Sequence, residues 1–194
     1  MSKEIILAST SPRRRQILNL FEIKFKVVDP EYDEVFEKNL DARKLALSLA
    51  RGKAEAALKK HPKGVIIAAD SLVCLGKKIF GKPKDDKQAM QMLKALSGKT
   101  NKVVTAVVMI DALANKVFYE VIETRVKFKQ LSNEQIKKYV ATKEPLGRAG
   151  AYALQGLGFD LIEKISGSIT GSIGLPMEVV FKGFKKLGIK FLEK

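Results

Sequence analysis

The sequence predicts an α/β fold in which strands and helices alternate around a mixed β-sheet. Short, continuous apolar runs typical of buried strands occur at residues 4–8 and 65–69. A segment with helical spacing of its apolar residues lies between them at 41–60. The two longest strand signals, 103–110 and 117–128, follow each other closely, and the second alternates apolar and polar residues. Interleaving of this kind favours an α/β architecture.

In the N-terminal part of the chain, capping residues predict where the helices begin. Ser11 is a good N-cap and Pro12 suits the first helical position, so a helix is expected directly after the first strand. A second strand is expected at 23–28. Asp41 then opens a helix that continues to about Lys60.

The strand at 65–69 is expected to end at Asp70, where polar residues follow the apolar run. Residues 72–80 fit a hairpin around Gly76 and Lys77. Asp85 starts a helix, which Gly98, thirteen residues on, is expected to stop.

Ser132 and Gln135 form a capping box, so a helix is expected over 133–141. Residues 145–174 are punctuated by glycines and predict irregular structure with short strand-like pieces around Tyr152 and at 161–165. A closing amphipathic helix is expected from the spacing of Met177, Val180, Phe181, Phe184 and Leu187. There is no repeat and no convincing linker, so residues 1–194 are expected to form one α/β domain, with two small lobes as the upper limit.

Composition limits the chemistry. The formal net charge of +15, from 36 Lys and Arg against 21 Asp and Glu, predicts an anionic partner, and nucleotides, nucleic acids and acidic lipids fit it equally well. The single cysteine and single histidine leave little room for disulfides, cysteine-rich zinc sites or a Ser-His-Asp hydrolase. No stretch approaches the roughly 20 apolar residues that cross a bilayer. No signal-peptide pattern is present, so a cytoplasmic protein without membrane contact is expected.

The first candidate site is the strand-to-helix junction from Ser9 to Arg15. Arg13, Arg14 and Arg15 lie at the start of a helix, where unpaired N–H groups form the positive end of the helix dipole. Each cation near the axis is unfavourable there by roughly 0.3–1 kcal/mol. A bound phosphate would reverse that penalty. The alternative, an exposed basic turn whose arginines pair with acids elsewhere, is equally open.

Asp70 is the second candidate, since ligand sites in open α/β sheets lie beyond the carboxyl ends of strands. Its carboxylate could hold a divalent metal ion or accept a proton from water. The alternative is that Asp70 caps a turn through its own side chain, and by position alone this alternative ranks slightly ahead.

Three further polar residues stand in restricted contexts. Lys82 lies between Gly81 and Pro83, which would hold its ammonium in place, whereas Lys53 lies within a helix. For both, the ordinary alternative is a solvated lysine. Gln155 lies among glycines, where its amide could approach a base edge, and a turn with a surface glutamine is the simpler explanation.

Taken together, these segments resemble the Maf family of nucleoside triphosphate pyrophosphatases. The resemblance rests on an ordered series of motifs that spans nearly the whole chain. They are Leu7-Ala8-Ser9-Thr10-Ser11-Pro12-Arg13-Arg14, Ala69-Asp70-Ser71, Gly81-Lys82-Pro83, Leu96-Ser97-Gly98, Val104-Thr105-Ala106-Val107, Ala149-Gly150-Ala151-Tyr152-Ala153-Leu154-Gln155-Gly156 and Gly174-Leu175-Pro176.

The resemblance implies an elongated, two-lobed fold around a central mixed sheet, similar to the inosine triphosphatase fold, with an active-site cleft between the lobes. It implies hydrolysis of a nucleoside triphosphate to the monophosphate and pyrophosphate, and a homodimer. Asp70 would be the proton acceptor, and Ser9, Arg13, Arg14, Lys53 and Lys82 would surround the triphosphate.

The resemblance also implies a divalent metal ion, Mg²⁺ or Mn²⁺, held by Asp70 and an acidic residue that corresponds loosely to Glu34. Whether Asp70 is the base or a metal ligand stays open. Arg13, Ser71 and Gln155 fall where the family sets base preference, and the pattern around Gln155 is similar to members acting on dTTP and UTP. CTP and modified nucleotides are further possible substrates, because Ser71 replaces the threonine typical of such members.

A basic nucleic-acid-binding module without catalysis is the alternative function. The positive charge supports it. The absence of Trp, the 7% aromatic content and the lack of a recognition-helix motif argue against it.

Overall fold

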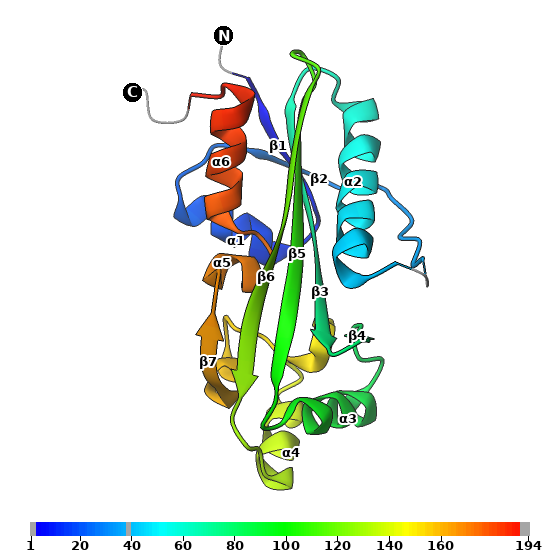
Figure 1. Ribbon diagram of the computed structural model, residues 1–194, viewed down its shortest axis with the longest axis vertical. Coiled ribbons are helices and arrows are strands. Elements are labelled where there is room, and N and C mark those ends of the chain that lie inside the picture. Colours follow the sequence, from blue (N-terminus) through cyan, green and yellow to red (C-terminus); the bar gives the residue numbers. More distant parts are fainter. Residues whose placement is uncertain (1–2, 38–39, 191–194) are drawn as a thin grey trace. The chain divides into compact units, whose positions relative to one another are not determined.

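The computed structural model describes residues 3–37 and 40–190 and shows a mixed α/β fold (Figure 1). The elements are β1 (Ile5–Ala8), α1 (Pro12–Leu20), β2 (Lys26–Val28), α2 (Ala42–Lys60), β3 (Val65–Leu75), β4 (Lys78–Phe80), α3 (Asp86–Leu96), β5 (Thr100–Asp111), β6 (Lys116–Phe128), α4 (Asn133–Ala141), the 3₁₀ helices η1 (Ala149–Ala151) and η2 (Leu157–Leu161), β7 (Ile162–Ser166), α5 (Ile169–Ile173) and α6 (Met177–Leu187).

The strands form a seven-stranded sheet in the order β2-β1-β3-β5-β6-β7, with β4 paired to β3. β1 runs parallel to both β2 and β3, whereas the β3–β4 and β6–β7 pairs are antiparallel. The predicted mixed sheet is therefore confirmed. The chain divides into two compact units, one from the described residues of 1–71, 105–122 and 174–194, the other from 72–104 and 123–173.

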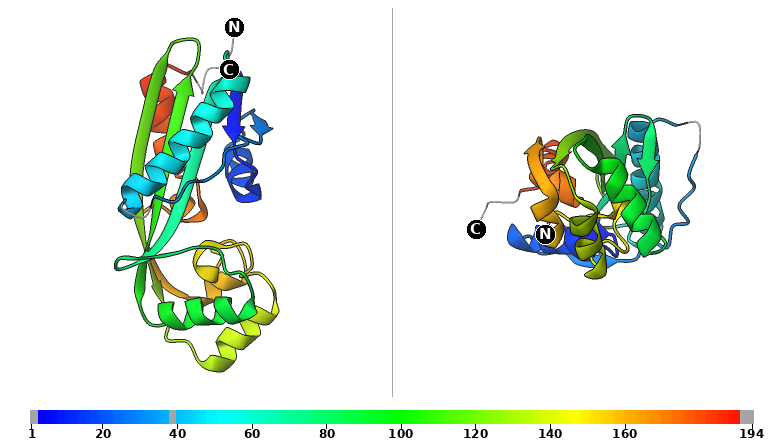
Figure 2. Two further views of the ribbon diagram at one scale, coloured as in Figure 1. Left: turned by 90° about the vertical axis from the view of Figure 1, so that its right-hand side faces the viewer. Right: turned by 90° about the horizontal axis from the view of Figure 1, so that it is seen from below.

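In the first unit, α2 and α6 cover opposite faces of the strands (Figures 1 and 2). Gly183 of α6 packs on Phe118 of β6, while Arg51 of α2 lies 5.5 Å from the ring centroid of the next residue, Tyr119. Successive side chains of a strand point to opposite faces, so the two helices must lie on different sides. β1 and the start of β3 lie between these layers and are almost completely buried, which explains their continuous apolar sequence.

The second unit has its own apolar core beneath α3, α4 and β7. Its largest fully buried side chain is Phe128, whose ring stacks edge-to-face on Tyr152 with centroids 4.9 Å apart. The Tyr152 hydroxyl donates to Asn101 Oδ1 at 3.0 Å, so this buried phenol is satisfied. The rest of the core comes from Val73, Phe80, Ala89, Leu93, Leu96, Val103, Val126, Leu131, Ile136, Tyr139, Val140, Ala151, Leu161 and Ile162.

Most predicted boundaries are confirmed, including the capping box of α4 and the Asp41 cap of α2. The predicted end of the third strand at Asp70 is wrong, because β3 continues to Leu75 and pairs there with β4. The strand-like piece around Tyr152 is also wrong, since the residues before it form η1. Among the described residues, no helix is both long and apolar enough to cross a bilayer.

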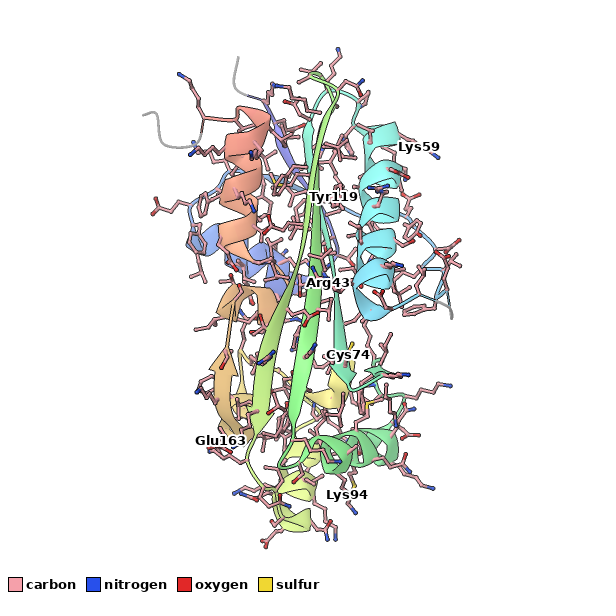
Figure 3. All side chains as sticks on the ribbon, in the orientation of Figure 1. Arg43, Lys59, Cys74, Lys94, Tyr119 and Glu163 are labelled. Atoms are coloured by element: carbon pink, nitrogen blue, oxygen red, sulfur yellow. The ribbon has the colours of Figure 1, made fainter. Side chains whose placement is uncertain are left out.

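Cys74 lies on β3 in the second unit (Figure 3) and is 5% exposed. Burial raises the pKa of its thiol to about 11, and the charge of Glu123 adds to that rise. The thiolate, which is the reactive form, is therefore scarce at neutral pH.

We expect Cys74 of the native protein to react slowly with the thiol reagent DTNB at pH 8, and promptly once the chain is unfolded in guanidinium chloride. The measurement is the release of thionitrobenzoate with time. Rapid native reaction would contradict the burial of this thiol.

Candidate active site

The first part of the site is the turn between β1 and α1. Ser9, 4% exposed, accepts at Oγ from the Ser11 backbone N–H at 3.2 Å and from Arg14 Nη1 at 3.0 Å. Two accepted bonds leave the proton of this hydroxyl available for donation. Ser11 is the N-cap of α1 as predicted, but its side chain makes no capping hydrogen bond. The N–H groups that open α1 thus gain no acceptor from the capping side chain.

Arg14 ties this turn to a distant part of the chain. Its Nε donates to the backbone oxygen of Gly174 at 2.9 Å, across 160 positions of sequence. Burial lowers the pKa of Arg14, and the negative charges of Asp70 and Glu34 act in the opposite direction. A guanidinium remains charged under these conditions, so Arg14 supplies a fixed positive charge beside two carboxylates. Arg13 lies half-buried in the first turn of α1.

Lys53 is the centre of the site's charge network. Its Nζ lies 2.5 Å from Asp70 Oδ1 and 2.7 Å from Glu34 Oε1. Lys53 is on the buried face of α2, between Ala50 and Ala54, and is only 9% exposed. Lysines are almost never buried unless paired, so the two carboxylates explain this position.

Asp70 reaches Lys53 from the middle of β3. The residue is 7% exposed, and its side chain is bonded to Lys53 rather than to its own backbone. The turn-capping alternative for Asp70 is therefore excluded, because the residue lies within a strand and makes a tertiary ion pair. Glu34 lies in the irregular segment before α2, with its side chain 42% exposed.

Ser71, the next residue of β3, belongs to a second hydrogen-bonded group. Thr105 Oγ1 donates to Ser71 Oγ at 2.9 Å, and Thr105 is 1% exposed. A Cβ on Gly174 would lie 3.8 Å from Ser71 Oγ and 3.6 Å from Arg14 Nε, and Gly174 has a φ of +129° that favours glycine. Gly174 therefore lies against both Arg14 and Ser71.

Lys82 and Gln155 belong to the second unit. Both residues are exposed. Their segments are linked within that unit, because the backbone N–H of Gly150 donates to the backbone oxygen of Gly81 at 3.1 Å. Gly150 adopts a φ of +72°, and a Cβ there would lie 2.9 Å from Val73. Glycine is therefore required at position 150 by its positive φ and by the close approach of Val73.

The structure thus brings Ser9, Arg14, Glu34, Lys53, Asp70 and Ser71 into contacts within the first unit. Sequence reasoning missed the contacts of Thr105 and Gly174. Both residues were visible only as parts of motifs. The available signals were a threonine inside an apolar strand and a glycine before Leu175-Pro176.

The carboxylates of Asp70 and Glu34 are the groups of this site that could bind a divalent metal ion. Among the described residues, no three His, Cys, Asp or Glu side chains gather in a metal-binding group. Mg²⁺ commonly takes one or two carboxylates together with substrate phosphates and water. Asp70 and Glu34, which share the Lys53 ammonium, form such a pair. The donor set fits a metal ion that binds along with a triphosphate.

Comparison with known proteins decides the family. A family model described as Maf-like protein matches residues 4–187. The chain belongs to the Maf-like proteins. The match extends across all the motifs that carry the contacts described above, from Ser9 to Gly174.

Relatives of this Maf-like chain cover nearly all of it. A Bacillus velezensis protein named dTTP/UTP pyrophosphatase is 38% identical over 98% of this chain and 100% of its own length. An Aquifex aeolicus protein of the same name is 43% identical over 95% of this chain and 96% of its own. Among solved structures, the Staphylococcus aureus Ham1 protein aligns over 82% of this chain and 80% of its own, with 19% identity and a TM-score of 0.48.

Proposed function

We propose that this Maf-like chain hydrolyses nucleoside triphosphates, foremost dTTP and UTP, to the monophosphate and pyrophosphate. The observation that carries the proposal is the buried Asp70 carboxylate held by Lys53, in the same unit as the arginine-rich start of α1. The names of relatives at 38–43% identity support the same activity. Nothing in these comparisons favours the nucleic-acid-binding alternative.

In the proposed reaction, a water molecule attacks the α-phosphorus. A new bond forms between the water oxygen and phosphorus, the bond from phosphorus to the bridging oxygen breaks, and pyrophosphate leaves. Asp70 takes the proton of the water. Negative charge accumulates on phosphate oxygens, so fixed cations supply most of the stabilisation.

The cations have different proposed tasks. Arg13 and the N–H groups at the start of α1 would contact phosphate oxygens. Arg14, whose Nε and Nη1 are used by Gly174 and Ser9, would mainly hold that turn in place. The role proposed for Lys82 toward phosphate rests on the family pattern. Mg²⁺ or Mn²⁺, bound through Asp70 and Glu34, would withdraw charge from the phosphate oxygens.

Base preference is proposed to depend on Ser71 and Gln155, with Arg13 as the third residue that the family pattern assigns. Because Thr105 donates to Ser71 Oγ, the Ser71 hydroxyl keeps its own proton for donation. That donor suits a carbonyl oxygen of thymine or uracil better than the amino group of cytosine. The amide of Gln155 can both donate and accept, which matches the neighbouring imide and carbonyl of a pyrimidine.

The test is a screen of dTTP, UTP, CTP, GTP, ATP and modified triphosphates with Mg²⁺, Mn²⁺ or EDTA. We expect release of pyrophosphate and the monophosphate, fastest with dTTP and UTP and stopped by EDTA. Orthophosphate as the first product would contradict attack at the α-phosphorus. A preference for GTP or ATP would contradict the assignment of Ser71 and Gln155.

A homodimer in the cytoplasm completes the proposal. Light scattering coupled to gel filtration would report the assembly, with a mass of two chains expected. Fractionation of cells would report the compartment.

A further inference from the structure

Gln155 lies at the centre of a short segment that two side chains hold on either side. The backbone N–H of Ala153, two residues before it, donates to the Tyr139 hydroxyl at 3.2 Å. The backbone N–H of Leu157, two residues after it, donates to Glu144 Oε2 at 3.0 Å. The Gln155 side chain is exposed and makes no hydrogen bond with another described residue. The backbone is therefore fixed while the amide stays available.

Glu144 is the main anchor of this segment. Besides Leu157, its carboxylate accepts from the backbone N–H of Gly158 at 2.9 Å and from the Tyr139 hydroxyl at 2.9 Å. The two N–H groups open η2, whose N-cap is Gly156, a residue without a side chain that could accept them. Glu144 supplies the missing acceptor from thirteen positions away, and a negative charge is favourable at this end of a helix.

Two glycines show how closely the Gln155 segment packs against Glu144 and Tyr139. A Cβ on Gly156 would lie 2.4 Å from Glu144 Oε2, and a Cβ on Gly158 would lie 2.5 Å from the Tyr139 hydroxyl. Any side chain at either position would displace the anchor. Burial also raises the pKa of Tyr139 above its ordinary value, so its hydroxyl remains protonated and donates to Glu144.

We propose that Glu144 and Tyr139 are positioning residues for base selection. They hold the backbone of Gln155 so that its amide meets the base in one orientation. The inference rests on the proposed function, in which Gln155 contacts the base. Selection through hydrogen bonds depends on orientation, because these bonds weaken steeply as their angles deviate. A looser segment would let Gln155 adapt to the wrong base.

The test compares Glu144→Ala, Gln155→Ala and the double variant by the ratio of kcat/KM for UTP to that for GTP. We expect each single change to lower this ratio by about tenfold, the discrimination that one well-directed hydrogen bond supplies. The double variant should be no worse than Gln155→Ala alone, because Glu144 acts through Gln155. Glu144→Gln, which keeps one acceptor oxygen, should fall between Glu144→Ala and the unchanged protein.

Glu163→Ala is the matched control. Glu163 lies on β7 of the same unit (Figure 3), and its exposed carboxylate pairs with Lys127 at 2.7 Å. This change removes the same charge without touching the Gln155 segment, so the UTP-to-GTP ratio should stay unchanged. If Glu144→Ala does not fold, Tyr139→Phe removes the acceptor of Ala153 and should lower the ratio in the same way.

Three outcomes overturn the inference while leaving the proposed function intact. They are an equal loss of kcat/KM for all nucleotides, an additive loss in the double variant, and an unchanged ratio in Glu144→Ala. An unchanged ratio in Gln155→Ala would instead contradict the proposed contact between Gln155 and the base, and the inference would fall with it. A chain that releases pyrophosphate from none of the triphosphates would instead refute the proposed function, and the inference would fall with it.

Discussion

We expect Asp70→Asn to lower kcat for dTTP by about a thousandfold, the contribution of a general base or of a carboxylate that would bind a metal ion. Asparagine keeps the size of the side chain and an acceptor oxygen but cannot take a proton. Lys53 retains Glu34 as a partner, so the variant is expected to fold with a lower melting temperature. Steady-state pyrophosphate release and circular dichroism measure the two effects.

Asp111→Asn is the control for Asp70→Asn. Asp111, like Asp70, is a buried aspartate paired with a lysine, since it accepts from Lys3 Nζ and from the backbone N–H of Ala114 at 3.1 Å. It has no place in the proposed reaction. Asp111→Asn should therefore lower stability while the folded protein keeps its kcat. Activity near that of the unchanged protein in Asp70→Asn would reject both roles proposed for Asp70.

Lys53→Met has the second largest expected effect, a loss of activity of about a hundredfold or more. The change keeps the unbranched, apolar part of the side chain but removes the cation that Asp70 and Glu34 share. The two carboxylates then repel each other and lose the position that the ammonium gave them. Removing one partner of a buried ion pair costs about 3–5 kcal/mol, so the melting temperature should fall as well.

Lys60→Met provides the comparison on the same helix. Lys60 also forms a 2.5 Å ion pair, with Glu31, but the two side chains are 46% and 69% exposed. Exposed pairs of this kind contribute about 0–1 kcal/mol. Activity and melting temperature of Lys60→Met should both stay close to those of the unchanged protein. An equal loss of activity in the two variants would show that Lys53 has no special role.

Much of the local structure could be predicted because its determinants lie within a few residues. Ser132 and Gln135 cap α4 reciprocally, and Asp41 accepts from the backbone N–H groups of Arg43 and Lys44 at the start of α2. The end of β3 could not be predicted in this way, because it depends on strands that are distant in the sequence. Aspartate and serine are poor strand formers, yet β3, which lies between β1 and β5 in the sheet, continues through Asp70 and Ser71 and pairs with β4 at residues 73–75.

The candidate residues of the site were also available from motifs, but their roles were not. The motif predicts Arg14, like Arg13, as a phosphate ligand, and the structure adds that two of its nitrogens join Ser9 to Gly174. Glu144 carried no signal at all, because an acidic residue after a helix is ordinary. Its task appears only where the N–H groups of Leu157 and Gly158 reach it.

The order of the elements, the excess of positive charge and the residue types available for chemistry can be derived from the amino-acid sequence, since these depend on composition and near neighbours. Which charges are buried together depends on the folded arrangement of distant segments. Lys53 can be buried because folding brings Asp70 and Glu34 to its ammonium from separate segments. The free-energy cost of burying a charge is offset only when the charge is paired in this way.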